Sequence, residues 1–353
     1  MAFDSDLLRE LCLAPAPTGF EGPVQQVLRR RFSSRAEIRS DPLGNLLAAV
    51  GPADGPGVLV AAHADQIGLI VTFVDEHGFI FFQKIGGVDQ QVLPGRDVVI
   101  HAAGGPVVGV VGRRPVHLTP KEEQGKAPEI HEQFIDIGAV DRAAALERVT
   151  IGDPVTFAPR FIELAADTYA TLAADDRAGV YVAARALELY AADPGSARFI
   201  AFSTVQEETT SMGARAQTLL QRPAVVVVVD VDFATDHPGM DAKKAGGEVK
   251  LGGGPVLFRG IGSNHRLFDL VREVAAAEDV DLQVKASPGR TSTDADELMA
   301  TAGAATLSLS IPLRYMHSPF EVVRGSDMEA AATLLAALAR RIGEESSPQR
   351  FVL

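Results

Sequence analysis

The spacing of apolar residues at the start of the chain predicts a mixture of helices and strands. Apolar positions recur at helical spacing over residues 4–13 and 21–32, whereas residues 45–50 and 57–62 have the pattern of strands. The strand at 57–62 is almost wholly apolar, which is typical of a strand buried on both faces. We therefore expect it to lie at the centre of a covered sheet.

A different pattern occupies residues 69–165. Short β-type runs are separated by turns such as Glu-His-Gly, and the helical signal is limited to a short turn at 142–147. Strands at this spacing predict a small all-β barrel or sandwich. Within this segment, residues 120–133 are polar and charged, so we expect a loop there.

After Asp175 the helical and strand patterns alternate again to the end of the chain. The expected helices cover 177–192, 214–221, 266–277 and 328–342, the last ending at Gly343, and the expected strands cover 198–205, 224–229, 282–286 and 305–311. The chain is 353 residues long, which corresponds to about two domains. We predict an α/β fold with a mixed central sheet covered by helices, formed by residues 1–68 and 166–353. An all-β, barrel-like domain formed by residues 69–165 is inserted into it.

The charge of the chain argues against two classes of partner. Lys and Arg total 33 against 46 Asp and Glu, a formal net charge of −13 at pH 7. This sign disfavours nucleic acids and anionic membrane surfaces as partners, because both attract basic proteins. Apolar runs such as 224–229 are far shorter than the ~20 residues of a spanning helix, and the N-terminal sequence MAFDSDLLRE does not have the pattern of a secretion leader. We expect a cytoplasmic protein.

The cysteine content limits the metal chemistry. Cys12 is the single cysteine of the chain, so neither an intrachain disulfide nor a cysteine-based zinc site can form. A metal site would have to be built from His, Asp and Glu. No role is assigned to Cys12 itself.

Candidate metal ligands follow several of the expected strands. In open α/β sheets, ligands bind outside the carboxyl ends of the strands. The residues at such positions are His63, Asp65, Glu207, Glu208, Asp230 and His317, and Asp175 with Asp176 opens a helix. Each alone has an ordinary structural explanation, but together they bring two imidazoles and several carboxylates to one edge of one sheet. Divalent cations are the simplest means of stabilising such a cluster, and ligands without thiolates suit Zn²⁺, Co²⁺ or Mn²⁺.

Five segments occur in the order HADQIG, ADDRAG, VQEE, DVDFATDHPG and RYMHSP. With the β-only insert between the first and the second, they resemble the TET-type dinuclear-metal aminopeptidases, the glutamyl and deblocking aminopeptidases of the zinc-exopeptidase clan. The resemblance implies a zinc-exopeptidase-like α/β domain, two divalent metal ions per chain, and peptide substrates with a free N-terminus. It also implies that the insert is a dimerisation domain and that dimers assemble into a hollow tetrahedral dodecamer.

The same resemblance assigns a role to each candidate metal ligand. Asp175 would bridge the two metals. His63 and Asp230 would complete the coordination of the first metal. Glu208 and His317 would complete that of the second.

Two further residues receive catalytic roles from the resemblance. Asp65 would orient the imidazole of His63, and Glu207 would be the general base that activates a water between the metals. Adjacent residues of a straight strand face opposite ways, so Glu207 and Glu208 can serve one site only where their strand ends. The activity implied is removal of the N-terminal residue from peptides.

The sequence departs from the usual motifs of the family at three places. Gln66 stands where Glu is expected, and the stretch TTSMG, which begins at Thr209, replaces the usual Val-Gly-Leu-Arg-Gly. Residues 289–296 (GRTSTDAD) replace a tighter Gly-Gly-Thr-Asp-Ala. These departures leave every ligand in place, and they bear on substrate preference instead.

Residues near two of these departures are candidates for binding the substrate. We expect Thr209, Thr293 and Asp294 to line the pocket for the first side chain. Asp294 either pairs with a basic group of the substrate or caps the helix expected at 295–302. Arg314 and Tyr315 either contact the substrate or stabilise the tetrahedral oxyanion, or Arg314 only neutralises nearby acids. The sequence leaves open whether acidic, neutral or basic N-terminal residues are preferred.

Two other functions compete with the peptidase. Relatives have been labelled endoglucanases, and Glu207 with Glu208 supplies two carboxylates for glycoside hydrolysis. That reaction needs carboxyl groups on opposite sides of the scissile bond, about 5–9.5 Å apart, which sequence neighbours at one strand end fit poorly. A catalytically silent, self-assembling scaffold is the other alternative, and it is disfavoured because every expected ligand and the base are present.

Overall fold

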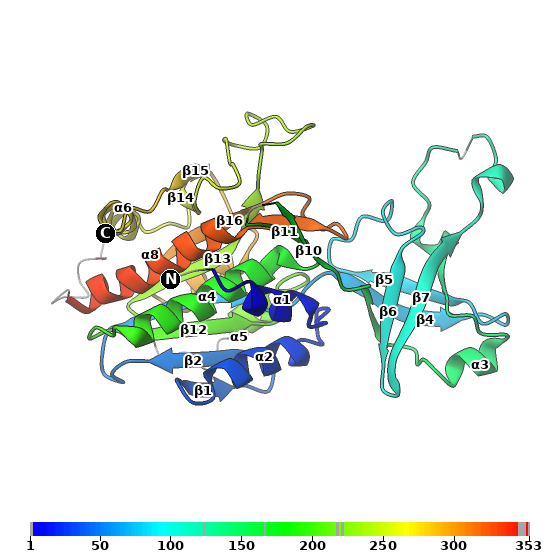
Figure 1. The fold of residues 1–353 in the computed structure, drawn as a ribbon, viewed down its shortest axis with the longest axis horizontal. Helices are drawn as coiled ribbons and strands as arrows, with labels where there is room; N and C mark the ends of the chain where they lie inside the picture. The colour runs from blue at the N-terminus through cyan, green and yellow to red at the C-terminus, as the bar shows by residue number, and fades with distance from the viewer. Residues whose placement is uncertain are drawn as a thin grey trace.

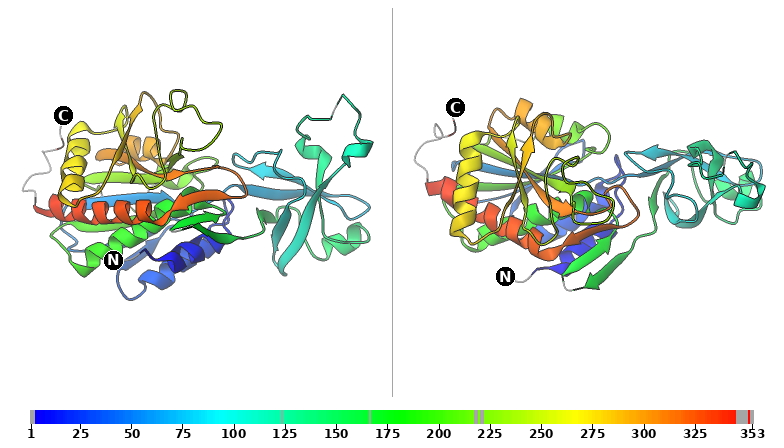
Figure 2. Two further views of the ribbon diagram at one scale, coloured as in Figure 1. Left: turned by 45° about the horizontal axis from the view of Figure 1, so that its top comes forward. Right: turned by 90° about the horizontal axis from the view of Figure 1, so that it is seen from above.

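The computed structural model describes residues 3–122, 124–165, 167–216, 219, 222–344 and 351. The chain forms a broad α/β body and a narrower β barrel that projects from one end of it (Figure 1). Two further views show the same division, with the N- and C-terminal segments both in the α/β body (Figure 2).

A mixed sheet forms the centre of the α/β body. Over the described residues its strands are, in spatial order, β1 (Glu37–Ser40), β2 (Leu46–Val50), β12 (Arg198–Thr204), β3 (Gly57–His63), β13 (Val225–Phe233), β16 (Ala305–Leu313), β14 (Val256–Gly260) and β15 (Gln283–Ser287). The central strands β12, β3, β13 and β16 run parallel to one another. The strands on either side of them join by antiparallel pairing.

Helices cover both faces of this sheet. One face packs against α1 (Ser5–Leu13), α2 (Gly22–Phe32), α4 (Ala174–Ala192), α6 (His265–Ala277) and α8 (Gly325–Glu344), and the other against α5 (Met212–Ala216) and α7 (Asp294–Thr301). Strand β3 shows why its sequence is apolar throughout. Val58 and Val60 belong to the apolar cluster that contains α4, whereas Leu59 and Ala61 belong to the cluster that contains α7.

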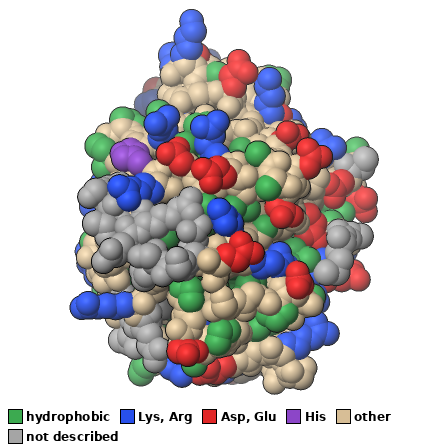
Figure 3. Space-filling view, turned by 90° about the vertical axis from the view of Figure 1, so that its left-hand side faces the viewer, with side chains coloured by type: hydrophobic (Ala, Val, Ile, Leu, Met, Phe, Trp, Pro, Cys, Tyr) green, Lys and Arg blue, Asp and Glu red, His purple; other side chains and the backbone are tan. Residues whose placement is uncertain are grey.

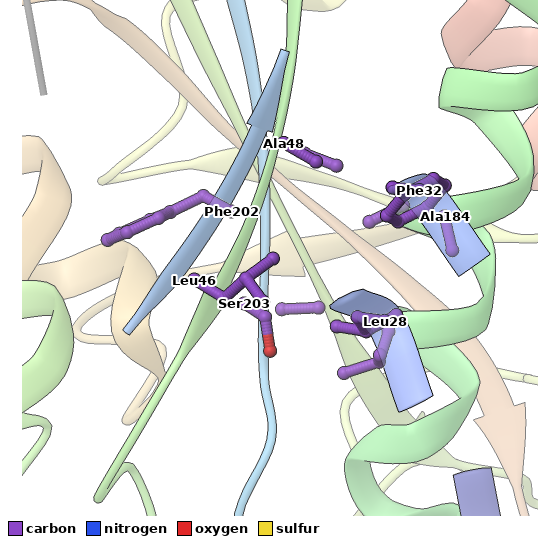
Figure 4. A pocket seen from close by; sticks show the side chains of 11 residues that line it. Leu28, Phe32, Leu46, Ala48, Ala184, Phe202 and Ser203 are labelled. Atoms are coloured by element: carbon purple, nitrogen blue, oxygen red, sulfur yellow. The ribbon is translucent and has the colours of Figure 1, made fainter. Parts of the chain in front are cut away.

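The core between α2, α4 and the sheet contains one small void (Figure 4). Its volume is about 10 Å³, and its lining is apolar except for Ser203, whose hydroxyl has no hydrogen-bond partner. A space of this size holds at most a single water molecule. It is therefore a packing feature and not a ligand site.

The inserted segment forms a closed antiparallel barrel. Its strands are, in order around the barrel, β4 (Gly68–Val74), β5 (Ile80–Ile85), β8 (Gln133–Asp136), β7 (Gly105–Arg113), β6 (Asp97–Ala102) and β9 (Pro154–Phe157). The short helix α3 (Arg142–Leu146) and the 3₁₀ turns η1 (Val116–Leu118) and η2 (Ile130–Glu132) lie in its connections. Apolar side chains such as Val71, Phe82 and Ile135 fill the interior. The predicted α/β fold with a barrel-like insert is confirmed.

A small antiparallel sheet lies between the barrel and the α/β body. It consists of β10 (Phe161–Ala165), β11 (Thr168–Thr171) and β17 (Glu321–Arg324), with β11 in the middle. The chain leaving the barrel thus pairs with a strand close to its C-terminal helix. This pairing brings residues 321–324 beside the start of α4.

Several elements differ from the sequence predictions. The pattern missed β1, β10, β11, β14 and β17, which are short strands of four or five residues. Strand β13 continues past Asp230 to Phe233, because its pairing with β16 continues to that point. Helix α8 passes through Gly343 instead of ending there, and α5 ends at Ala216. Residues 217, 218, 220 and 221 of the helix expected at 214–221 lie outside the described residues.

The surface of the α/β body carries side chains of both charges. At the end remote from the barrel, Lys and Arg side chains are interspersed with Asp and Glu (Figure 3). Among the helices of the described residues, none is both long and apolar enough to cross a membrane.

Candidate metal centre and active site

One face of the large sheet changes from apolar to polar towards the ends of its central strands. Val228 of β13 pairs with Ala61 of β3 in parallel register. Side chains alternate between faces along a strand, so the next residues on that face are Asp230 and His63. Both are buried. The strand register itself therefore sets these two side chains next to each other.

Asp175 lies between the two histidines of the site. Its Oδ1 is 3.1 Å from Nε2 of His63, and its Oδ2 is 3.4 Å from Nε2 of His317. A carboxyl oxygen of Glu208 lies 3.3 Å from the same nitrogen of His317. A carboxylate held in this way, with one oxygen towards each imidazole, can bridge two cations.

Two groups of side chains each present ligand atoms that lie within 4.8 Å of one another. The first comprises His63, Asp176 and Asp230, and the second comprises Asp175, Glu208 and His317. Asp176 was not assigned as a ligand from the sequence. Its carboxylate accepts hydrogen bonds from the backbone N–H groups of Gly179, at 2.9 Å, and His63, at 3.3 Å. Those bonds tie it to the start of α4 and the end of β3.

Asp65 connects the first histidine to the two glutamates. One of its oxygens lies 3.3 Å from Nδ1 of His63. Its carboxylate also accepts hydrogen bonds from the backbone N–H groups of Glu207, at 2.9 Å, and Glu208, at 3.1 Å. Strand β12 has ended before these residues, so both glutamate side chains leave a turn and reach the same site. Asp65 fixes that turn.

Glu321 has a similar position on the other side of the cluster, although the sequence did not identify it as a site residue. Its carboxylate accepts hydrogen bonds from the backbone N–H groups of Asp175, at 3.0 Å, and His317, at 2.8 Å. It is buried at the first position of β17. The available signal was a charged residue at the start of the short apolar run EVV, four residues after His317.

The electrostatics of the cluster are strongly perturbed. Burial raises the pKa of Glu207 to about 9 and that of Asp230 to about 8. Hydrogen bonds with Asp175 and Glu208 raise the pKa of His317 to about 11. Burial opposes the protonated form of His63, but Asp175 and Asp65 outweigh it and raise its pKa well above the ordinary value. The carboxylates therefore need positive charge nearby, which protons supply when no cation is present.

These side chains open into a large cavity of about 990 Å³. His63, Asp175, Glu207, Glu208, Asp230 and His317 form one part of its lining. Other parts come from β14, β15, β16 and the segment before α7. The volume is large enough for the end of a peptide chain.

Comparison with known proteins identifies the family. Residues 44–334 match the model of the M42 glutamyl aminopeptidases. The chain belongs to this family. The resemblance found in the sequence is thereby confirmed, and the protein is an aminopeptidase.

Relatives and solved structures agree over nearly the whole aminopeptidase chain. The lysyl aminopeptidase of Pyrococcus furiosus is 34% identical, with 99% of both chains covered. A TET aminopeptidase from a marine sediment archaeon of the Thaumarchaeota is 31% identical, with a TM-score of 0.90 and 96% of both chains covered. A TET peptidase of Pyrococcus horikoshii, described as assembling into a tetrahedron or a large octahedral shell, is 29% identical, with a TM-score of 0.85, 95% of this chain and 98% of that one covered. A Thermotoga maritima protein described as an endoglucanase is 27% identical, with a TM-score of 0.77, 97% of this chain and 99% of that one covered.

The residues expected to bind substrate in this aminopeptidase occupy different environments. Thr293 lines the cavity and caps α7 by accepting a hydrogen bond from the backbone N–H of Ala295. Thr209 is exposed and is not part of the lining, which includes Ser211 instead. Asp294 is buried and accepts a hydrogen bond from the hydroxyl of Thr204 at 2.5 Å.

Arg314 forms an ion pair with an aspartate outside the cavity of this aminopeptidase. Its guanidinium donates two hydrogen bonds, of 2.8 and 2.7 Å, to the carboxylate of Asp236. It does not contribute to the lining of the cavity. The structure thus pairs Arg314 with an acid, and a role of Arg314 towards the substrate stays a prediction.

Gln66, the first departure from the family motifs, lies next to the buried guanidinium group of Arg177. Its Oε1 accepts hydrogen bonds from Nη2 of Arg177, at 3.0 Å, and from the backbone N–H of Ala16, at 3.3 Å. Arg177 is fully buried and also donates to the carbonyl of Leu11. Since Arg177 directly follows Asp176 at the start of α4, these bonds connect this helix to the segment between β3 and β4.

Proposed function

We propose that this aminopeptidase removes N-terminal residues from peptides at a site that holds two divalent cations. His63 and Asp230 would hold the first cation, Glu208 and His317 the second, and Asp175 both. The observation that carries this proposal is the position of Asp175, whose two oxygens face the two histidines at 3.1 and 3.4 Å.

The residues present fit such cations. The donor set contains imidazole nitrogens and carboxylate oxygens, which suit Zn²⁺, Co²⁺ or Mn²⁺. Oε1 of Glu208 is buried without a hydrogen-bond partner, so one of its lone pairs is free for a cation. Asp65 and Glu321 would hold the ligands in place from behind, as outer carboxylates do in metal sites.

Glu207 is the proposed general base. It faces the cavity beside His63, with 3.9 Å between its carboxylate and Nε2. Bound cations would polarise the peptide carbonyl and lower the pKa of an attacking water. Glu207 would accept the proton of that water and return it to the departing amine, while Asp65 keeps its backbone fixed.

The substrate would be a peptide with a free N-terminus. Its α-ammonium group carries a positive charge, and the acidic cluster offers the complementary charge at one end of the cavity. A peptide interior lacks that charge, so the arrangement favours exopeptidase activity. The family is described by glutamyl specificity and one relative by lysyl specificity, so the family name alone does not predict the preferred residue.

The two alternative functions receive less support. A glycosidase would need two carboxyl groups facing each other across a scissile bond. Glu207 and Glu208 instead project from one turn that Asp65 holds, and Glu208 contacts His317. A silent scaffold is disfavoured because the proposed base and ligands meet around one cavity.

The proposed assembly is a homo-oligomer built from dimers, and a tetrahedral dodecamer is its proposed final form. Residues 69–165 would be the dimerisation domain, and residues 1–68 and 166–353 the catalytic domain. Apolar side chains exposed on the barrel support this division, for example Val108 and Val110 of β7, which are 65% and 52% exposed. Light scattering tests the assembly, and a monomer in dilute solution would contradict it.

The experiment that tests the function is an activity assay on metal-loaded protein. We expect protein supplied with Co²⁺ or Zn²⁺ to cleave aminoacyl-p-nitroanilides, to lose this activity on chelation and to regain it when the metal is returned. Reducing-sugar release from soluble cellulose is measured in parallel. The absence of cleavage across a complete panel of N-terminal residues would refute the proposal.

A further inference from the structure

An ion pair lies in the wall of the cavity, outside the proposed metal ligands. Nζ of Lys285 on β15 is 2.8 Å from both carboxylate oxygens of Asp232 on β13. Only 10% of the Lys285 side chain and 9% of the Asp232 side chain are exposed. Both residues line the cavity. None of the roles proposed above uses this pair.

The pair is close to where the first residue of a peptide would bind. Asp232 is two positions after the proposed ligand Asp230 on the same strand, so both side chains emerge on the same face, about 7 Å apart along the strand. Lys285 pairs with Phe258 across β14 and β15, and its Nζ lies 5.9 Å from the centre of the Phe258 ring. The side chain of an N-terminal residue held at Asp230 can therefore reach the pair.

The pair gives this part of the wall no net charge. A substrate carboxylate would be attracted by Lys285 and repelled by Asp232, and a substrate ammonium group would experience the reverse. Arg290, also in the lining, is likewise paired, with Asp296 at 3.3 Å and Glu297 at 3.4 Å. At the Asp232–Lys285 pair, a charged side chain would lose its hydration on entry without gaining a partner of net opposite charge.

We propose that the Asp232–Lys285 pair determines the charge preference of the pocket for the first side chain of the substrate. While the pair is intact, the pocket favours uncharged side chains. Loss of Asp232 leaves Lys285 free to bind acidic side chains, and loss of Lys285 leaves Asp232 free to bind basic ones. This inference rests on the proposed function, because it assumes that N-terminal residues bind at this site.

The test compares three substrates in two variants. We measure kcat/KM for leucyl, glutamyl and lysyl p-nitroanilides with wild-type protein, Asp232→Asn and Lys285→Gln. Wild-type protein should prefer the leucyl substrate. Asp232→Asn should raise the glutamyl-to-leucyl ratio roughly tenfold, and Lys285→Gln should raise the lysyl-to-leucyl ratio by a similar factor, the change that about 1.4 kcal/mol of differential interaction produces.

Matched controls come from an exposed ion pair. Glu248 and Lys250 are 3.4 Å apart, with side chains 73% and 63% exposed, and neither lines the cavity. Glu248→Gln and Lys250→Gln make the same changes of charge at the surface and should leave both ratios at the wild-type values. The double variant Asp232→Asn with Lys285→Gln, which again has no net charge in the wall, should keep the preference for leucine.

Binding of free leucine, glutamate and lysine, measured by calorimetry, gives a second readout that does not require turnover. The affinities should follow the same order as the kinetic ratios in each variant. Wild-type protein that cleaves none of the substrates would refute the proposed function. If wild-type protein is active, the following results would overturn this inference and leave the proposed function standing. Either the single variants leave both kcat/KM ratios at the control values or move them in the same direction, or the double variant favours a charged substrate.

Discussion

Two adjacent glutamates differ in what their side chains contact. Glu208 lies against His317, whereas Glu207 faces the cavity near His63. We predict that Glu207→Gln lowers kcat by about 10²–10⁴-fold, the usual contribution of a general base, with metal content unchanged. Glu208→Gln, the matched control, should lower metal content. Elemental analysis and steady-state kinetics measure both effects. Retention of full activity by the Glu207 variant would remove it from the role of base.

Glu321 provides a prediction for a residue that the sequence did not reveal. Each of its carboxylate oxygens accepts one hydrogen bond, from the backbone N–H of Asp175 or of His317. A glutamine has one acceptor oxygen and can keep only one of these bonds. Glu321→Gln should therefore weaken metal binding by about 10–100-fold. Titration in metal buffers measures this, and Glu329→Gln, which alters a carboxylate paired with Arg185, is the control. Equal affinity in the two variants would contradict the prediction.

At the scale of elements, the contact between β12 and α7 contains a buried acid. The hydroxyl of Thr204 donates a hydrogen bond to the carboxyl group of Asp294, and burial raises the pKa of Asp294 from 3.8 to about 6. Between these values the native state binds more protons than the unfolded state, so this group reduces stability as pH rises from about 4 to 6. The free energy of unfolding of Asp294→Asn minus that of wild type should thus be larger at pH 7 than at pH 4, by on the order of 2 kcal/mol.

Urea unfolding with a chelator present, at both pH values, measures this difference. Asp193→Asn is a suitable control, because the Asp193 side chain is 84% exposed. The predicted effect is the pH dependence that Asp294→Asn shows beyond that of this control. A constant difference between Asp294→Asn and wild type would show that the buried carboxyl does not titrate in this range.

The sequence predicted those elements whose environment is uniform along their length. Strands β3 and β13 are buried on both faces, and the change from apolar residues to His63 and Asp230 is visible in the chain itself. Strands β14 and β17 are short; β14 ends with Gly260, and Gly325 directly follows β17. Glu321 meets Asp175 across a separation of 146 residues, because β17 pairs with β11. No local pattern encodes such a contact, so the sequence alone could not pair Glu321 with Asp175 or Lys285 with Asp232.

At the scale of the whole molecule, the candidate metal centre lies where several segments of the α/β body meet. Its side chains come from β3, β13, the start of α4, the turn after β12 and the loop before β17. Their mutual repulsion opposes folding when no cation is present, and binding of cations to the native state stabilises it by mass action. We therefore expect chelation to lower the melting temperature and added Zn²⁺ or Co²⁺ to restore it.

The pH dependence of stability distinguishes cations bound at the acidic cluster from ions that stabilise the protein by binding elsewhere. Without cations, burial raises the pKa of Glu207 to about 9 and those of Asp230 and Glu321 to about 8. The native state then holds protons that the unfolded state has lost, so stability should fall as pH rises from 6 to 9. Cations bound at Asp230 and close to Glu207 and Glu321 would favour the ionised forms of all three, so metal-loaded protein should lose much less stability over the same range. Chemical unfolding at pH 6, 7.5 and 9, with metal or with chelator, measures both slopes, and equal slopes would mean that the cations do not bind beside these carboxylates.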